Sequence, residues 1–356
     1  MAGGLVASSL PASAAPVAWH TVPANWGAQA QFIEVGQVYT SGNQSWFAVI
    51  KHTSTAALPV VQACTGAVCT LQRLPMLGYD DGYALGVSGT SSTDVWVVGS
   101  LNGEDGTDAM SWHWDGTKWT AFRGPDGFIF MTQVLTVSAN ESWALGNDNF
   151  GDGTTGTIFH RVGTSWTEVN SVLTPDVLPG TCAEWYYNGF SDLAYVGGEP
   201  VVVGVCDGVH VILKQRSATS WARIDTALPT DVVYTHATVV NNQLWVSGQR
   251  PDGSTDIERR ASGQWIAVPA TGLTGANIQQ MAAGPNGTVV AVGYTGTVEA
   301  PTSASWQWDG STWTPISTPG NARLSTVSVA SNGYTVAGGF NPSNEVKPAF
   351  LSRTTL

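Results

Sequence analysis

The sequence is poor in charge, and above all in positive charge. Asp, Glu, Lys and Arg together make up 11% of its 356 residues, against about 25% in an ordinary globular protein. Only four residues are lysine, and the formal net charge is −12. Nucleic-acid binding depends on clustered positive charge. The composition therefore predicts that no nucleic acid is bound.

Long hydrophobic runs are also missing. No apolar run reaches the 18 or so residues that a membrane-spanning helix needs, so no membrane span is expected. The apolar content of 43% is nevertheless enough to build a core, which excludes a wholly disordered chain. Glycine occurs 41 times and tryptophan 16 times. These values are typical of a turn-rich β protein.

Cysteine is scarce, with four residues. An even number fits two disulfides in an oxidising compartment. Residues 2–15 (AGGLVASSLPASAA) are small and weakly apolar, and Ala12-Ser13-Ala14 resembles a signal-peptidase cleavage site. A basic start and a longer apolar stretch, which complete a signal peptide, are missing. We expect residues 1–15 to be a signal-peptide remnant or a disordered segment of a secreted, extracellular protein.

One motif recurs along the chain. It reads DVWVVG at 94–99 with SWHWDGTKWT at 111–120, and again VAVG at 290–293 with WQWDGSTWT at 306–314. The last tryptophan of each copy is an anchor, at Trp119, Trp166, Trp221, Trp265 and Trp313, and the same step extended backwards gives Cys69 and Trp19. Residues 19 to 313 thus hold seven anchors at a mean spacing of 49. Periods of about 40–50 residues indicate the blades of a β-propeller.

The repeat predicts an all-β, seven-bladed propeller of four-stranded blades over residues 16–356, as a single domain. In the clearest copy we expect strands near 82–89, 94–100, 108–115 and 118–123, and almost no helix. The last copy breaks off after its third strand at residues 350–353. The N-terminal segment Trp19–Val22 supplies the missing outer strand. Closing the ring this way leaves no exposed sheet edge.

The residue five positions before each anchor is expected to lie opposite it across a hairpin. The resulting pairs are Trp114–Trp119, Trp308–Trp313, Arg161–Trp166, Arg216–Trp221, Arg260–Trp265 and, across the ring closure, Arg353–Trp19. The arginine pairs are read as cation–π stacks. In the first copy the two positions are Cys64 and Cys69, which predicts a disulfide. All of these residues are interpreted as structural.

The pattern Val-Trp-x-Val-Gly followed by Trp-Asp-Gly-x-x-Trp-Thr resembles the repeat of secreted bacterial seven-bladed β-propellers, several of which are lectins. It is similar to the propeller lectins of entomopathogenic bacteria and to the lectin subunits of umbrella-toxin particles. The resemblance covers residues 17–356, although blades one, four and seven depart from the motif. It implies a non-catalytic, glycan-binding protein that could be the targeting subunit of an extracellular assembly.

Signals for catalysis are poor. Gly151–Gly156 matches G-x-G-x-x-G but lacks a strand–turn–helix context, and no G-x-S-x-G or H-E-x-x-H occurs. Carboxylates that could line the central channel are Glu34, Asp80, Asp81, Glu184 and Asp192, and nothing pairs any two of them. Three classes of function stay open. They are a lectin, which we favour, a protein-interaction scaffold without sugar binding, and a glycoside hydrolase with two carboxylates in a cleft.

Metal sites are equally weak in the sequence. His113 and His160 share one position in neighbouring blades, which indicates a repeat-encoded structural residue. Two acidic loops, 102–108 and 148–153, are rich in oxygen ligands of the kind that Ca²⁺ needs. Neither has the spacing of an EF-hand, and Asp and Gly are common in solvated turns. We therefore expect no metal site and no cofactor, with Ca²⁺ in these loops as the alternative.

The best candidate ligand platform is an insertion. The step from Trp166 to Trp221 is 55 residues, and the excess lies in 178–188. A disulfide between Cys182 and Cys206 would hold this loop on the face where D–A and B–C connections emerge. The predicted ligand-binding residues are Glu184, Trp185, Tyr186, Tyr187 and Asn188, with Trp26 and Tyr79 on other D–A loops as secondary candidates. Alternatively, these aromatic residues cover the neighbouring blade.

Overall fold

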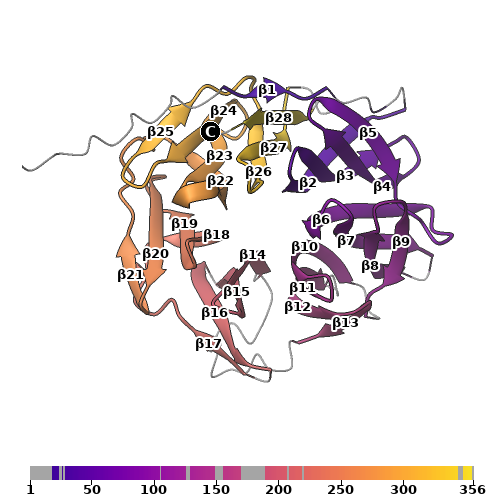
Figure 1. Cartoon of the computed structure of the whole chain (residues 1–356), viewed down its shortest axis with the longest axis horizontal. Coiled ribbons are helices and arrows are strands. Elements are labelled where there is room, and N and C mark those ends of the chain that lie inside the picture. The colour runs from indigo at the N-terminus through magenta and orange to yellow at the C-terminus, as the bar shows by residue number, and fades with distance from the viewer. Residues whose placement is uncertain are drawn as a thin grey trace, which may run out of the picture.

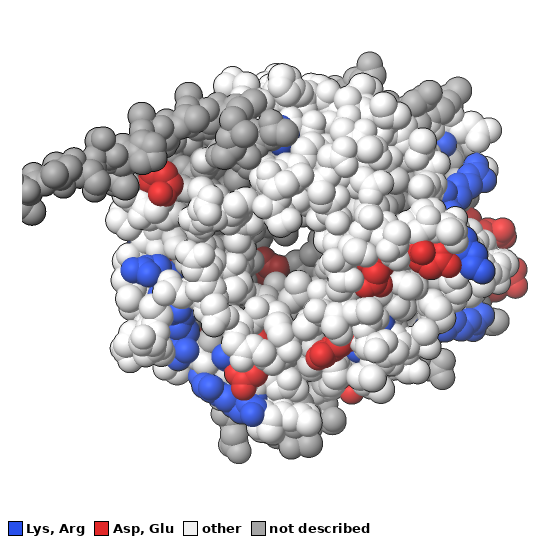
Figure 2. Space-filling model, in the orientation of Figure 1, with Lys and Arg blue, Asp and Glu red and all other residues white. Residues whose placement is uncertain are grey.

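The chain forms a closed ring of seven four-stranded antiparallel sheets (Figure 1), and the space-filling view shows a channel at its centre (Figure 2). This computed structural model describes residues 18–23, 26, 29–104, 106–125, 129–148, 155–169, 189–206, 208–218, 220–343 and 348–354. Within them the only helix is a 3-10 turn at Pro285–Gly287. None of these residues belongs to a helix long and apolar enough to cross a lipid bilayer. The predicted seven-bladed β-propeller is confirmed.

Each blade runs from an inner strand A to an outer strand D. Blades 1 to 3 are β2 (Phe32–Ser41), β3 (Gln44–His52), β4 (Ala57–Thr65), β5 (Val68–Arg73); β6 (Asp81–Ser91), β7 (Asp94–Gly103), β8 (Gly106–Trp114), β9 (Trp119–Arg123); and β10 (Ile129–Ser138), β11 (Glu141–Asp148), β12 (Thr155–Val162), β13 (Ser165–Glu168). Blades 4 and 5 are β14 (Gly189–Val196), β15 (Glu199–Cys206), β16 (Val209–Ser217), β17 (Ser220–Arg223); and β18 (Val233–Val240), β19 (Gln243–Gln249), β20 (Thr255–Ala261), β21 (Gln264–Ala267). Blade 6 is β22 (Asn277–Ala283), β23 (Val289–Gly296), β24 (Pro301–Trp308) and β25 (Trp313–Ile316).

Blade 7 combines the two ends of the chain. Its strands are β26 (Arg323–Val329), β27 (Tyr334–Phe340), β28 (Ala349–Thr354) and the N-terminal β1 (His20–Thr21). β1 pairs antiparallel with β28, with His20 opposite Ser352. The backbone N–H of Val22 continues the ladder by donating to the carbonyl of Phe350 at 2.7 Å. The N-terminal strand therefore closes the ring, as predicted, and covers an edge that would otherwise be open.

The core lies between the blades. Buried apolar side chains of the described residues form seven clusters, one at each blade–blade interface. Anchor tryptophans add polar links between blades. The indole N–H of Trp166 donates to Ser111 Oγ at 3.0 Å, and that of Trp19 donates to Ser305 Oγ at 2.7 Å. Each bond joins strand D of one blade to strand C of the blade before it, which gives the anchors a structural role.

Most of the predicted cross-strand pairs are present. Trp114 lies opposite Trp119 and Trp308 opposite Trp313, with ring centroids 5.5 Å apart in both pairs. The guanidinium carbons of Arg260 and Arg353 lie 5.9 Å and 5.1 Å from the ring centroids of Trp265 and Trp19. Cys64 lies opposite Cys69, and the two are joined by the predicted disulfide. One strand position thus accepts an indole, a guanidinium or a disulfide.

Two of the predicted stacks are wrong. Arg161 lies opposite Trp166 on the backbone, but its guanidinium stacks on Trp96 of the preceding blade, with its carbon 3.9 Å from the ring centroid. Burial lowers the pKa of Arg161 to about 10. In blade 4, an irregularity in the β16–β17 pairing shifts the register, so that Gln215 lies opposite Trp221 and Arg216 is exposed.

Candidate functional site

The channel is narrow and lined by polar side chains from the inner strands. All seven inner strands carry a β-bulge at the same position of the repeat. Beside the bulges lies a cavity of about 270 Å³, whose lining includes Gln37, Gln133, Asp192, His236 and Gln280. A bulge leaves one residue unpaired and turns a side chain out of the sheet. All seven blades contribute residues at or beside the bulge to the lining of this cavity.

These channel side chains connect neighbouring blades. Gln280 Oε1 accepts from the backbone N–H of Val327 in blade 7 at 2.6 Å, and Thr326 Oγ1 accepts from Val38 of blade 1 at 3.0 Å. Asp192 accepts from the side-chain amide of Gln133 in blade 3 at 2.6 Å and from the N–H of Ala237 in blade 5 at 2.8 Å. Their polar atoms are thus used to hold the ring together.

Among the described residues, Asp192 is the one carboxylate that lines the channel cavity. Complete burial raises its pKa to about 6, although its hydrogen bonds oppose the shift. His236 lies beside it, with 4.0 Å between His236 Nδ1 and Asp192 Oδ2, and burial lowers the pKa of His236 to about 4. The imidazole is therefore neutral at pH 7 and does not compensate the carboxylate. A raised carboxylate pKa is common at functional sites, but the bonds of Asp192 are those of a cross-blade support.

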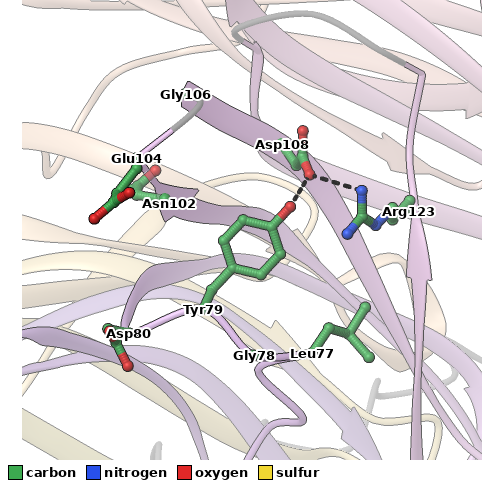
Figure 3. A pocket seen from close by; sticks show the side chains of 10 residues that line it. Leu77, Gly78, Tyr79, Asp80, Asn102, Glu104, Gly106, Asp108 and Arg123 are labelled. Atoms are coloured by element: carbon green, nitrogen blue, oxygen red, sulfur yellow. Dashed lines mark hydrogen bonds and ion pairs between the residues drawn. The ribbon is translucent and has the colours of Figure 1, made fainter.

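A cavity at the rim of blade 2 is open to solvent. Its volume is about 700 Å³, and it is lined by Leu77, Gly78, Tyr79, Asp80, Asn102, Gly103, Glu104, Gly106, Asp108 and Arg123 (Figure 3). We call it the blade 2 pocket. The loop that leads from β5 to β6 supplies one wall, and the turn between β7 and β8 supplies the other. The repeat explains this meeting, because D–A and B–C connections emerge on the same face.

Tyr79 is the centre of the blade 2 pocket and is held in place on three sides. Its hydroxyl donates a hydrogen bond to Asp108 Oδ2. This carboxylate oxygen also forms an ion pair with Arg123 Nη1, at 3.3 Å. The guanidinium carbon of Arg123 lies 5.6 Å from the Tyr79 ring centroid. A Cβ atom at Gly103 would lie 3.1 Å from two ring carbons of Tyr79. Glycine there allows the ring to lie against the backbone of the turn.

The charge of the blade 2 pocket is negative. Asp80, Glu104 and Asp108 contribute three carboxylates against the one guanidinium of Arg123. In Figure 3 Asp80 and Glu104 point away from the Asp108–Arg123 pair, so their oxygens are free to accept from a ligand that enters between the two walls. No group of three or more His, Cys, Asp or Glu side chains among the described residues is arranged to hold a metal ion. The lining therefore offers hydrogen-bond acceptors beside an aromatic ring.

The other predicted site residues have different positions. Trp26 is buried, with its ring centroid 5.4 Å from that of Phe350, so its prediction as a ligand platform is wrong and it belongs to the core. Glu34 pairs with His52 at 3.0 Å. Cys206 ends β15 and is buried. The loop residues Cys182, Glu184, Trp185, Tyr186, Tyr187 and Asn188 lie outside the described residues, as does most of the second acidic loop.

Tyr79 alone among the residues that line the blade 2 pocket was predicted from the sequence as a ligand residue. Asp80 was predicted as a candidate for the central channel, Glu104 and Asp108 stood in an acidic loop that was interpreted as a solvated turn, and Arg123 ends an outer strand without any motif. The available signal was topological. Strands C and D of one blade pair with each other, so Asp108 at the start of β8 and Arg123 at the end of β9 lie at the same end of the sheet.

No protein-family model and no curated protein matches the chain. Solved structures do match it. It is similar to YCF48 bound to D1 peptide, at 13% identity over 97% of this chain and 99% of the other, with a TM-score of 0.62. It is similar to the β-propeller domain of the Trilobed protease from Pyrococcus furiosus, at 9% identity over 90% of this chain and 95% of the other, with a TM-score of 0.59. It is also similar to the polysaccharide lyase Uly1, at 10% identity over 92% of this chain and 90% of the other, with a TM-score of 0.54. Identities this low support the β-propeller fold alone.

Proposed function

We propose that this protein is a secreted, non-catalytic β-propeller that binds a glycan in the blade 2 pocket. The observation that carries the proposal is the fixed Tyr79 ring, with the carboxylates of Asp80 and Glu104 on the side of the ring away from the Asp108–Arg123 pair. Sugars bind through an apolar C–H face on an aromatic ring and through hydroxyls that meet a few placed polar groups. The blade 2 pocket offers both.

The arrangement favours a sugar with free hydroxyls. A hydroxyl donates strongly to an ionised carboxylate, and Asp80 and Glu104 supply two such acceptors. Because the hydrogen bond to Asp108 and the stacked guanidinium of Arg123 already order Tyr79, little side-chain entropy is lost when a ligand contacts the ring. The Cys64–Cys69 disulfide supports an extracellular location, since disulfides persist in oxidising compartments.

A protein-interaction module is the second candidate. The solved structure of YCF48 holds the D1 peptide, so a propeller of this shape can hold a peptide. The blade 2 pocket has more carboxylates than guanidinium groups, which favours a peptide with Lys or Arg. Such a peptide belongs in the same experiment.

The test is a glycan array followed by calorimetric titration of the sugars that bind. We expect Tyr79→Ala and Glu104→Gln each to lower the affinity about tenfold or more, which corresponds to about 1.4 kcal/mol. Asp252→Asn is the matched control, because Asp252 is an exposed carboxylate in the B–C turn of blade 5. Its affinity should equal that of the parent protein, and EDTA should have no effect.

Three results would contradict the proposal. Parent-like affinity in both pocket variants would place the site elsewhere. Loss of binding in EDTA would restore the calcium alternative. Binding of a Lys- or Arg-rich peptide without any glycan would favour the interaction module.

A further inference from the structure

A third cavity lies between blades 5 and 6, on the face of the A–B and C–D turns. Its volume is about 330 Å³, and it is lined by Val240, Asn241, Gln243, Trp245, Arg259, Ala267, Val268, Pro269, Gly287, Trp308, Gly310 and Ser311. We call it the Arg259 groove. Trp245 and Trp308 are buried and meet edge to face, with ring centroids 6.1 Å apart. No described carboxylate lines the groove, although the chain has a net charge of −12.

The repeat shows what is unusual about Arg259. In blades 2 and 3 the residue opposite the strand B tryptophan is a histidine that meets a carboxylate. His113 lies 2.8 Å from Asp94, and His160 lies 3.3 Å from Glu141. In both blades the imidazole stacks on the tryptophan, with ring centroids 4.4 Å and 4.1 Å apart. A basic group at this position is thus matched by an acid two residues before the tryptophan.

Blade 5 has a permanent cation there and no acid. Arg259 lies opposite Trp245, and its Nη1 donates to Gln243 Oε1 at 3.0 Å. Gln243 holds the place that Asp94 and Glu141 hold in the other two blades. An amide orients the guanidinium without neutralising it, and no described carboxylate forms an ion pair with Arg259. Other Lys and Arg side chains gather over blades 4 and 5 in Figure 2. Three of those in these blades, Lys214, Arg223 and Arg250, are paired with carboxylates, whereas Arg259 has no such partner.

The same groove holds a second donor that lacks an acceptor. The indole N–H of Trp245 is buried and has no hydrogen-bond partner among the described residues. In blade 3 the corresponding N–H of Trp143 donates to Glu141 Oε1 at 3.3 Å. In blade 5 the corresponding oxygen belongs to Gln243 and accepts from Arg259 instead. A buried donor without an acceptor is costly. The indole N–H of Trp96, in the blade that carries Asp94, also lacks a partner among the described residues, so Arg259 is the group of this groove that is offered to a ligand.

We infer that the Arg259 groove is a separate binding site for an anionic group, a carboxylate or a sulfate. A guanidinium matches such groups through two parallel N–H donors, and its charge acts more strongly where the lining excludes water. That the anionic group belongs to a sugar rests on the proposed function. The selectivity for an anion follows from the residues of the groove alone. The ligand class is therefore a uronic acid, a sialic acid or a sulfated sugar.

The molecule contains its own control groove. Between blades 1 and 2 lies a cavity of about 320 Å³ whose lining includes Gln44, Trp46, Ala63 and Trp114. Gln44 and Trp46 correspond to Gln243 and Trp245, and Ala63, opposite Trp46, corresponds to Arg259. The two grooves thus have similar volumes and corresponding Gln and Trp residues, and the second groove has an alanine where the first has Arg259. This second groove should not bind an anionic sugar.

The experiment is a titration monitored by the indole N–H resonances, with methyl glucuronide, methyl glucoside, a sulfated galactose, galactose and sodium sulfate as separate probes. We expect the two acidic sugars to shift the Trp245 resonance and to bind at least tenfold more tightly than their neutral counterparts. Arg259→Gln should abolish this preference, and Arg259→Lys should keep part of it. Raising the salt from 50 to 500 mM should weaken binding. Ala63→Arg should create a second anion-dependent shift at Trp46.

Several results would overturn the inference. Equal affinity for the glucuronide and the glucoside would remove the anion selectivity. An unchanged preference in Arg259→Gln would assign it to another residue. Sulfate ion that binds as tightly as the acidic sugars would refute the sugar as part of the ligand. Tyr79→Ala separates the two proposals, because it should remove binding at the blade 2 pocket and leave the Trp245 shift intact.

Discussion

Deletion of residues 18–23 is expected to lower the melting temperature by at least about 10 °C or to cause aggregation. The segment contains β1, and its side chains belong to two interfaces. Trp19 is buried in the cluster between blades 6 and 7, and Val22 is buried in the cluster between blades 7 and 1. Loss of a buried tryptophan alone costs about 3–5 kcal/mol, and 1 kcal/mol shifts the melting temperature of a large domain by roughly 2–4 °C.

The deletion also uncovers a charge. The Arg353 guanidinium is buried under Trp19, and burial lowers its pKa to about 10. Without the indole, this cation loses its aromatic cover, and the β28 edge becomes free to pair with another molecule.

Calorimetry of graded variants checks this prediction. Trp19→Phe keeps a ring over Arg353 but loses the N–H bond to Ser305, which should cost about 1 kcal/mol. Trp19→Ala should cost several times more. Deletion of residues 1–14, which the sequence predicts to lie outside the propeller, should leave the melting temperature unchanged. Equal melting temperatures for the two deletions would refute closure by β1.

Ring closure could be predicted from the sequence because it depends only on the number of repeats and on the number of strands in the last one. The period of 49 residues gives seven anchors, and the incomplete last copy requires an outer strand from elsewhere. The same register predicts the Cys64–Cys69 disulfide, since a cross-strand pair brings two Cβ atoms close enough for one. Features that follow from backbone pairing within one blade can therefore be derived from the repeat.

Features that depend on contacts between blades could not be predicted in this way. The repeat places Arg161 opposite Trp166 but does not say that its long side chain reaches Trp96 of the preceding blade. Nor does it indicate the β-bulges that turn polar residues towards the channel. A bulge adds one unpaired residue to a strand and shifts the alternation of its side chains by one, and the spacing of the anchors does not show where in the inner strand that shift falls.

The blade 2 pocket lies between these two cases. Tyr79 was predicted as a candidate because it lies on a D–A loop outside the motif. Its partners Asp108 and Arg123 come from two further strands, and their meeting depends on the length of β8 and β9. The sequence therefore indicated the face and one aromatic residue of the site, but not its charged residues.

Substitution of Asp192 by alanine is expected to lower the free energy of unfolding by about 2–5 kcal/mol. The change leaves the side-chain amide of Gln133 and the backbone N–H of Ala237 without their acceptor, and each buried donor so left costs about 1–3 kcal/mol. Gln280→Ala is the matched control, since it removes one such bond, to Val327. Urea denaturation of both variants should therefore show the larger loss for Asp192→Ala. An equal or smaller loss would contradict the role of Asp192 in joining blades 3, 4 and 5.

The pH dependence of stability gives an independent signature of the same carboxylate. The folded-state pKa of Asp192, about 6, lies above the ordinary value of 3.8, so its protonation favours folding. This contribution is complete below about pH 4 and is lost as the pH rises through 6, and it amounts to about 3 kcal/mol. The lowered pKa of His236, about 4, acts in the opposite direction over the same range, because protonation of the imidazole favours unfolding.

Between pH 6.5 and 4 the stability of the parent protein should therefore change little. Asp192→Asn should lose stability on acidification, and His236→Gln should gain it. The change of stability with pH should be steeper in His236→Gln, which keeps Asp192, than in Asp192→Asn, which keeps His236. The His236 side chain is 23% exposed, so water weakens the effect of burial on the imidazole. Parallel pH profiles in the two variants would show that the channel does not hold Asp192 as a buried carboxylate.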